Sequence, residues 1–257
     1  MQHILEKEFK GIKSMDNNET VYLLGNGPSL NKVDVHQLKT KNTISFNRAF
    51  IAYEDWGFDP THYMVVDPVV MENTADDVNR MIADSKIQSF FFRKRFDKYL
   101  SERNEKVKLI DFKQRFWERG FRWSSDLKRM GMIANVGATA IPVLCALGYK
   151  RVIILGTDCN YEEQNIKNVS IVENEGEPDR RIVYKSEGDN DPNHFRPDYF
   201  GKGTEYSKPQ TQNHFNGWKF ISKTYKKKGM EILLCSPGSR LASLFPEIEF
   251  EEAIKKY

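Results

Sequence analysis

His194 stands in a short aromatic segment, residues 191–203, together with acidic and basic side chains. An imidazole can take a proton from an attacking hydroxyl at neutral pH, and Asp198 can do so if burial raises the pKa of its carboxyl. Arg196 or Lys202 can stabilise a leaving phosphate. The segment therefore predicts a general base with two candidates, His194 and Asp198. A solvated loop anchored by its aromatic residues would explain the composition equally well.

A glycine turn that follows the apolar run 21–24 is the second candidate site. It consists of Gly25, Asn26, Gly27, Pro28 and Ser29. Glycine allows backbone angles closed to other residues and leaves room for a ligand, and Pro28 with Ser29 as a cap can start a helix. Free N–H groups at such a turn are where phosphates bind. The turn matches neither the Walker loop nor the GxGxxG fingerprint, and an ordinary strand–helix turn is an equal alternative.

Polar residues also end several other predicted strands. The set is Asn26, Asn47, Asp67, Asp158 and Ser236. In a parallel sheet these ends share one edge, so we expect the side chains to converge on one ligand. Asparagine suits ribose hydroxyls and base edges because it both donates and accepts. Asp67 suits a ribose hydroxyl or a divalent cation, with a helix cap as the alternative.

The elements that must position these residues alternate between strand and helix. Strands are predicted at 21–24, 42–47, 62–67, 87–92, 107–112, 151–155 and 231–235, and helices at 72–86, 135–148 and 215–228. This alternation predicts an α/β fold, a doubly wound, mainly parallel Rossmann-like sheet with helices on both faces. We expect one domain, residues 1–257, with a long, lid-like, functional loop of little regular structure at 162–206. The Arg-, Trp- and Phe-rich stretch 113–130 is predicted to be a mobile lid or an acceptor contact.

Composition narrows the class of protein. The chain has 257 residues, 39% of them hydrophobic, and a net charge of +3, which indicates a folded protein and gives no argument for nucleic acid. Apolar runs stay well below the roughly 20 residues that span a bilayer, and the N-terminus lacks a signal-peptide core. We therefore expect a cytoplasmic protein, with peripheral contact at the inner membrane face and homo-oligomerisation as options. The three cysteines are predicted to be buried free thiols.

Three stretches together resemble the bacterial sialyltransferases of glycosyltransferase family 42. They are the turn 25–30, the segment 137–150 followed by Gly156 and Asp158, and the C-terminal residues 223–226, 234–236 and 241–242. The same turn, the Asp67-Pro68 pair and the His194-Phe195 pair also resemble the MptE-like domain. That broader group includes archaeal 6-hydroxymethylpterin diphosphokinases and flagellin glycosyltransferases.

The resemblance to the sialyltransferases implies roles for individual residues. Asn26 matches the asparagine that contacts the cytidine nucleotide, and Asn47 matches the asparagine that ends the second strand. A loop histidine is the base in that family, and a tyrosine pair holds the donor phosphate. By loop spacing the base falls nearer Asp198, whereas His194 matches a neighbouring histidine, and we favour His194. Two departures stand out: Asp67 replaces an asparagine, and Asn135-Val136 replaces Thr-Ser.

The resulting expectation is a glycosyltransferase with a nucleotide-activated donor, CMP-linked and of the sialic, nonulosonic or Kdo type. The acceptor would be a surface glycan such as lipopolysaccharide, capsule or glycoprotein. The nucleotide and its ribose would contact Asn26, Asn47, Asp67 and Asn135. The phosphate would contact the 25–29 amides together with Lys202 or Tyr206. The rest of the site would be formed by Gly137, Gly156 and Asp158. No cofactor is required for a CMP donor.

Two other functions remain open from the sequence. The first is an MptE-like diphosphokinase that moves pyrophosphate from ATP to a pterin alcohol, with Mg²⁺ held by Asp67 and Asp158. The second is a non-catalytic nucleotide-binding domain. Loss of activity on replacing His194 or Asp198 would argue against the latter.

Overall fold

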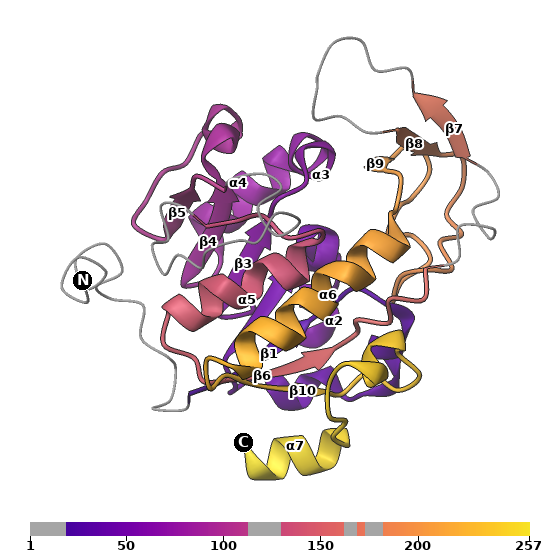
Figure 1. Ribbon diagram of the computed structural model, residues 1–257. Helices are drawn as coiled ribbons and strands as arrows, with labels where there is room; N and C mark the ends of the chain where they lie inside the picture. The colour runs from indigo at the N-terminus through magenta and orange to yellow at the C-terminus, as the bar shows by residue number, and fades with distance from the viewer. Residues whose placement is uncertain (1–18, 113–129, 162–168, 173–181) are drawn as a thin grey trace.

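The computed structural model describes residues 19–112, 130–161, 169–172 and 182–257. A seven-stranded sheet forms its centre (Figure 1). The strands are β1 (Thr20–Leu24), β2 (Thr43–Phe46), β3 (His62–Val65), β4 (Ser89–Arg93), β5 (Val107–Ile110), β6 (Arg151–Leu155) and β10 (Glu231–Leu234). Their order is β10-β6-β1-β2-β3-β4-β5, and every pairing is parallel. The predicted parallel α/β sheet is therefore confirmed.

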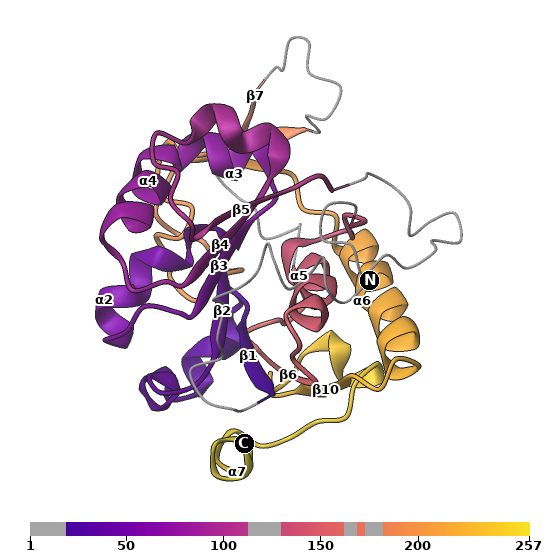
Figure 2. The ribbon, with the colours of Figure 1, turned by 90° about the vertical axis from the view of Figure 1, so that its left-hand side faces the viewer.

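Each central strand is buried on both of its faces, which is why it appears in the sequence as an unbroken apolar run. In β1, Val21 and Leu23 point into one hydrophobic cluster, and Tyr22 and Leu24 point into the other. Helices α5 (Val136–Ala146) and α6 (Thr211–Lys226) cover the first cluster. Helices α2 (Tyr53–Trp56), α4 (Ala75–Asp84) and α7 (Phe250–Lys256) cover the second (Figure 2). The doubly wound arrangement is confirmed.

The order of the strands reverses next to β1. The chain adds β2 to β5 on one side of β1 and later places β6 and β10 on the other side. In open α/β sheets such a reversal leaves a crevice at the carboxyl ends of the strands, and ligands bind there. The topology therefore directs attention to the turns that follow β1 and β6.

The structure corrects two predictions of local structure. The region 162–206 is not a loop of little regular structure, because its described part contains β7 (Val169–Val172), β8 (Val183–Ser186) and β9 (Glu205–Ser207), an antiparallel sheet. Strands of three or four residues are too short to give a clear periodic signal, although Val183 and Tyr206 are buried. The predicted helix 72–86 is two helices, α3 (Pro68–Asn73) and α4.

The remaining predictions for segments and cysteines have mixed outcomes. The stretches 1–18 and 113–129 lie outside the described residues. Cys145 and Cys159 are half-buried and Cys235 is buried, and all three are free thiols. Among the described helices, none combines the length and the apolar character that crossing a bilayer requires.

A buried histidine makes the stability of this fold depend on pH. His62 in β3 is fully buried, with Nε2 2.9 Å from the Tyr149 hydroxyl, and burial lowers its pKa to about 3. In the unfolded chain the His62 imidazole gains a proton near pH 6.5, whereas in the folded chain it stays neutral there. The contribution of neutral His62 to the free energy of unfolding is therefore complete above pH 6.5 and is lost as the pH falls. We expect the free energy of unfolding to drop by about 2 kcal/mol between pH 7 and pH 5 through this residue.

Urea unfolding at several pH values checks this expectation. His62→Gln should lose that part of the pH dependence, whereas the matched change of the exposed His36, His36→Gln, should keep it. Equal slopes in the wild type and in His62→Gln would contradict the assignment.

Candidate functional site

A cavity of about 590 Å³ lies at the carboxyl ends of β1, β2 and β6. Most of the residues predicted to form the site line it: Gly25, Asn26, Gly27, Pro28, Ser29, Asn47, Asp67, Asn135, Gly137, Gly156, Asp158, His194 and Tyr206. Asp198 and Lys202 are not in its lining. The strand ends and the loop 191–206 thus converge, although they are far apart in the sequence.

The glycines of the first turn serve close packing against the turn after β6. A methyl group added at Gly25 would lie 2.3 Å from the Gly156 carbonyl oxygen, and one added at Gly27 would lie 2.3 Å from Asp158 Oδ2. The amide of Gly25 donates to Leu155 O (2.8 Å), and that of Gly27 donates to Gly156 O (2.7 Å). These two N–H groups are therefore not free for a phosphate, which corrects the expectation from the sequence.

Ser29 is not a helix cap. The short 3-10 helix η1 (Pro28–Lys32) begins after Gly27, and no side chain caps it. The Ser29 amide donates instead to Asp158 Oδ2 at 3.0 Å, across the gap between the two turns. The side chain of Ser29 is buried, and its Oγ makes no hydrogen bond within the described part of the chain.

Four buried polar atoms of the cavity lining lack a partner among the described residues. They are Asn26 Oδ1, Asn47 Oδ1, Asp158 Oδ1 and Ser29 Oγ. Leaving such an atom unsatisfied costs about 1–3 kcal/mol, and buried polar groups in folded proteins are rarely left so. Three of the four atoms can only accept, and all four are buried beneath the surface of the cavity.

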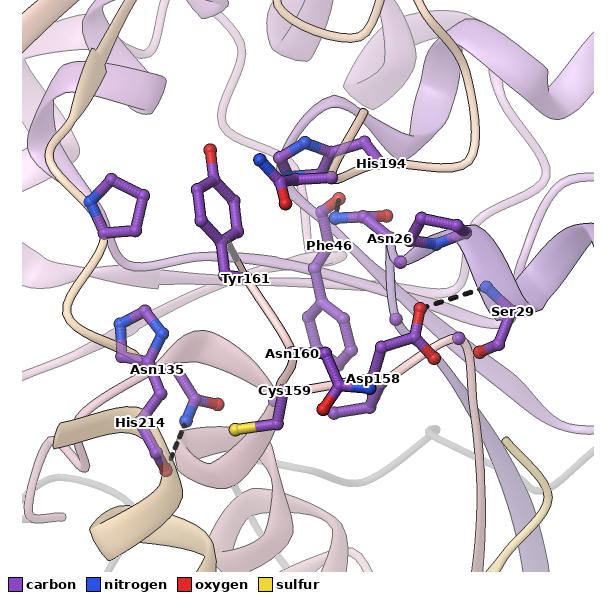
Figure 3. A pocket seen from close by; sticks show the side chains of 18 of the residues that line it. Asn26, Ser29, Phe46, Asn135, Asp158, Cys159, Asn160, Tyr161, His194 and His214 are labelled. Atoms are coloured by element: carbon purple, nitrogen blue, oxygen red, sulfur yellow. Dashed lines mark hydrogen bonds between the residues drawn. The ribbon is translucent and has the colours of Figure 1, made fainter. Parts of the chain in front are cut away.

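The neighbouring contacts fix these side chains. Asn26 Nδ2 donates to Phe46 O (3.2 Å), its neighbour in Figure 3, and to Tyr199 Oη (2.8 Å), whereas Oδ1 is buried without a partner among the described residues. Asn47 has a φ of 53°, a left-handed conformation in which asparagine is one of the few tolerated side chains. Such a strained residue at the edge of a cavity is typical of functional sites.

Asp67 and Asn135 both cap helices at the cavity. Asp67 Oδ1 accepts from the amides of Val69 (2.8 Å) and Val70 (3.2 Å) at the start of α3. The alternative interpretation of Asp67 as a helix cap is therefore confirmed. Asn135 Oδ1 accepts from Ala138 N (2.8 Å) at the start of α5. Any contact of these residues with a nucleotide stays a prediction.

His194 is held by an acidic side chain and by an aromatic ring. Its Nδ1 lies 2.7 Å from Asp191 Oδ2, and its imidazole stacks on the Tyr199 ring with centroids 4.0 Å apart. The Tyr161 ring approaches edge-on at 5.8 Å, and the two side chains lie together at the top of Figure 3. Because Asp191 engages Nδ1, Nε2 is the nitrogen left to act as a base.

Asp198 is engaged elsewhere. Both of its oxygens accept from the Arg196 guanidinium, at 2.9 and 3.0 Å, and this hydrogen-bonded pair holds the pKa of the carboxyl below its usual range. Arg196 also donates to Asp55 and to Ile51 O, so it fastens the loop to the body of the protein. Lys202 donates its backbone amide to Asp189. The geometry favours His194 over Asp198 as the base.

Three residues of this region were missed in the sequence as individual contributors. Asp191 and Tyr199 support His194, and Tyr161 lines the cavity. Burial raises the pKa of the Tyr206 hydroxyl to about 12, and it raises the pKa of the Tyr161 hydroxyl as well. Both hydroxyls therefore keep their protons and can donate hydrogen bonds. The spacing of Asp191 and His194 by three residues was the only signal for this pair in the sequence.

Comparison with known proteins gives one family and several similar folds. The family described as "6-hydroxymethylpterin diphosphokinase MptE-like" matches residues 1–164. The structure of MAf glycosyltransferase from Magnetospirillum magneticum AMB-1 is similar with a TM-score of 0.51 and 12% identity. The similarity covers 93% of this chain but only 34% of that one. At this identity the likeness concerns the fold alone.

Two structures of the sialyltransferase CstII from Campylobacter jejuni are more distant in shape. The complex with CMP-3FNeuAc has a TM-score of 0.46 and 16% identity, over 89% of this chain and 85% of that one. The complex with cytidine-5'-monophosphate has a TM-score of 0.48 and 15% identity, over 89% and 84%. A search of curated proteins found no match.

The contact between the two turns can be tested by adding one methyl group. Gly25→Ala is expected to lower the free energy of unfolding by about 3 kcal/mol, the upper end for overpacking, because the atoms in the way are mainly backbone. Urea denaturation measures the change.

Gly188→Ala is the matched control, since a methyl group there meets no heavy atom within 4 Å. It should shift stability by less than about 0.5 kcal/mol. Equal stability of the two variants would show that the turns can move apart.

Proposed function

We propose that this chain, which belongs to the MptE-like family, is a glycosyltransferase whose cavity binds a nucleotide-activated sugar, CMP-linked and of the sialic, nonulosonic or Kdo type. The observation that carries the proposal is one cavity whose lining brings the glycine turn and its asparagine and aspartate neighbours together with a held histidine. The fold is compatible with this activity, because a glycosyltransferase of similar fold is known.

The acceptor atoms suit an aminated base and a ribose. Asn26 Oδ1, Asn47 Oδ1 and Asp158 Oδ1 each need a donor. Ribose supplies two hydroxyl donors, and cytosine supplies an exocyclic amine, whereas uracil presents a carbonyl oxygen at that position. Uracil donates only through its ring N3–H, whereas the cytosine amine has two hydrogens, so cytidine can satisfy more acceptor atoms than uridine.

The phosphate of such a donor would lie between tyrosine hydroxyls and a cation. Tyr161 and Tyr206 line the cavity with their protons retained, and Lys32 lines it as well. A CMP donor releases a single phosphate, whose charge hydroxyl and ammonium donors can stabilise without a metal. These residues replace the 25–29 amides and Lys202 as the proposed phosphate contacts.

The proposed reaction is a direct displacement. His194 Nε2 takes the proton of the acceptor hydroxyl while the oxygen of that hydroxyl forms a bond to the anomeric carbon. The bond from that carbon to the phosphate oxygen breaks, and its electron pair leaves with CMP. The imidazolium that forms is balanced by the Asp191 carboxylate. We propose a surface glycan as acceptor and the cytoplasmic side of the membrane as the place of reaction.

A diphosphokinase is the second candidate, because the family description names that activity. Asp67 and Asp158 line the same cavity, and Mg²⁺ is commonly held by one or two carboxylates with substrate phosphates. Each aspartate already uses one oxygen for a backbone amide. The exocyclic amine of adenine would also satisfy the acceptor atoms, so only ligand binding separates the two activities.

A thermal-shift panel separates them. We expect CMP and CDP to raise the melting temperature without metal, because a ligand that binds only the folded state stabilises it. With a CMP-linked sugar, His194→Ala should keep this shift but lose about 10²–10⁴-fold in kcat, since it removes the base.

His36→Ala is the control, because this exposed residue lies outside the cavity lining. Stabilisation by Mg-ATP alone would favour the diphosphokinase. A shift with CMP but no transfer to any acceptor and no donor hydrolysis would favour a nucleotide-binding domain without catalysis.

A further inference from the structure

Asp191 is a buried acid whose contacts all serve the loop that carries His194. Its side chain is 7% exposed. Oδ1 accepts from the amide of Asn193 at 2.9 Å, and Oδ2 lies 2.7 Å from His194 Nδ1. Its own amide donates to Pro197 O at 2.8 Å. Both oxygens and the backbone are therefore fixed, and the carboxylate is aimed at the imidazole.

The partner of this carboxylate determines which ring nitrogen carries the proton. An ionised carboxylate only accepts, so a neutral imidazole beside it must carry its hydrogen on Nδ1. The lone pair then lies on Nε2. A buried carboxylate is also costly unless it is hydrogen-bonded or paired with a charge. Both considerations favour the same tautomer, the one that leaves Nε2 free to accept a proton.

Tyr199 fixes the plane of the imidazole. The two rings are nearly parallel, at 4°, with centroids 4.0 Å apart. Tyr199 is itself buried, and its hydroxyl accepts from Asn26 Nδ2 (2.8 Å) and from Arg48 N (3.3 Å). The face of an aromatic ring attracts a cation, so Tyr199 and Asp191 both stabilise the imidazolium once it forms.

We propose that Asp191 is a positioning residue, which holds His194 as the Nδ1–H tautomer, directs Nε2 to the acceptor hydroxyl and balances the charge of the imidazolium. The part of this inference that concerns catalysis rests on the proposed function. The tautomer itself is a property of the free protein and can be measured without any substrate.

The first test is spectroscopic. The chain has five histidines, so ¹⁵N-imidazole spectra are simple, and His194→Ala assigns the signal. At a pH where the ring is neutral, we expect His194 to be the Nδ1–H tautomer in the wild type. Asp191→Asn should abolish this preference, because the amide can donate to Nδ1 and drive the hydrogen to Nε2.

The second test is kinetic, with a CMP-linked sugar. Asp191→Asn should lower kcat at least about 100-fold, as expected when a base is held in the wrong tautomer, and should change KM for the donor by less than about threefold. Asp189→Asn is the matched control. Asp189 is exposed and lies two residues before Asp191. The side-chain oxygen of the introduced asparagine can still accept from the Lys202 amide, so the activity should stay within twofold of the wild type.

The outcomes separate this inference from the proposed function. An Nε2–H tautomer in the wild type, or an unchanged kcat in Asp191→Asn, would overturn the role of Asp191 while the transferase proposal stands. Absence of transfer by the wild type would instead overturn the transferase, and the spectrum would still decide the tautomer. The tautomer is read from the spectrum of the wild type, and replacing each of the other four histidines in turn assigns the His194 signal by elimination if His194→Ala folds poorly.

Discussion

The site depends on the close contact between the turn after β1 and the turn after β6. These strands are neighbours at the point where strand order reverses, so their ends must pass each other with only backbone between them. Gly25 and Gly27 permit this, since any side chain there would overlap Gly156 O or Asp158. The amides of the first turn bind the second turn. The glycines here allow close packing, and the proposed ligand contacts are therefore made by the side chains around the turn.

That division explains where the polar atoms lie. One oxygen of Asp158 accepts from the Ser29 amide, and the other has no partner among the described residues. Likewise, Asn26 Nδ2 donates to Phe46 O and to Tyr199 Oη, and Asn26 Oδ1 has no partner among them. One half of each side chain holds the two turns and the loop in place, and the other half is buried without a partner among the described residues.

The strands and the shared edge were predictable from the sequence because buried parallel strands are apolar on both faces. The partner of each polar group was not, because it depends on contacts between distant segments. Ser29 resembled a cap but meets Asp158, 129 residues away. Asp198 resembled a base but is paired with Arg196. The strands β7 to β9 were missed because they are only three or four residues long and few of their residues are buried.

Tyr199 joins His194, the proposed base, to Asn26 of the glycine turn. Its hydroxyl accepts from Asn26, its ring supports His194, and its carbonyl accepts from Arg48 Nε at 2.6 Å. The neighbouring Phe195 amide donates to Asn26 O at 2.9 Å. If Tyr199 moved, the orientation of Asn26 Oδ1 and the plane of the imidazole would change together. A ligand that ordered Asn26 would therefore also order the imidazole, which is what the proposed displacement requires, because donor and acceptor must be aligned before reaction.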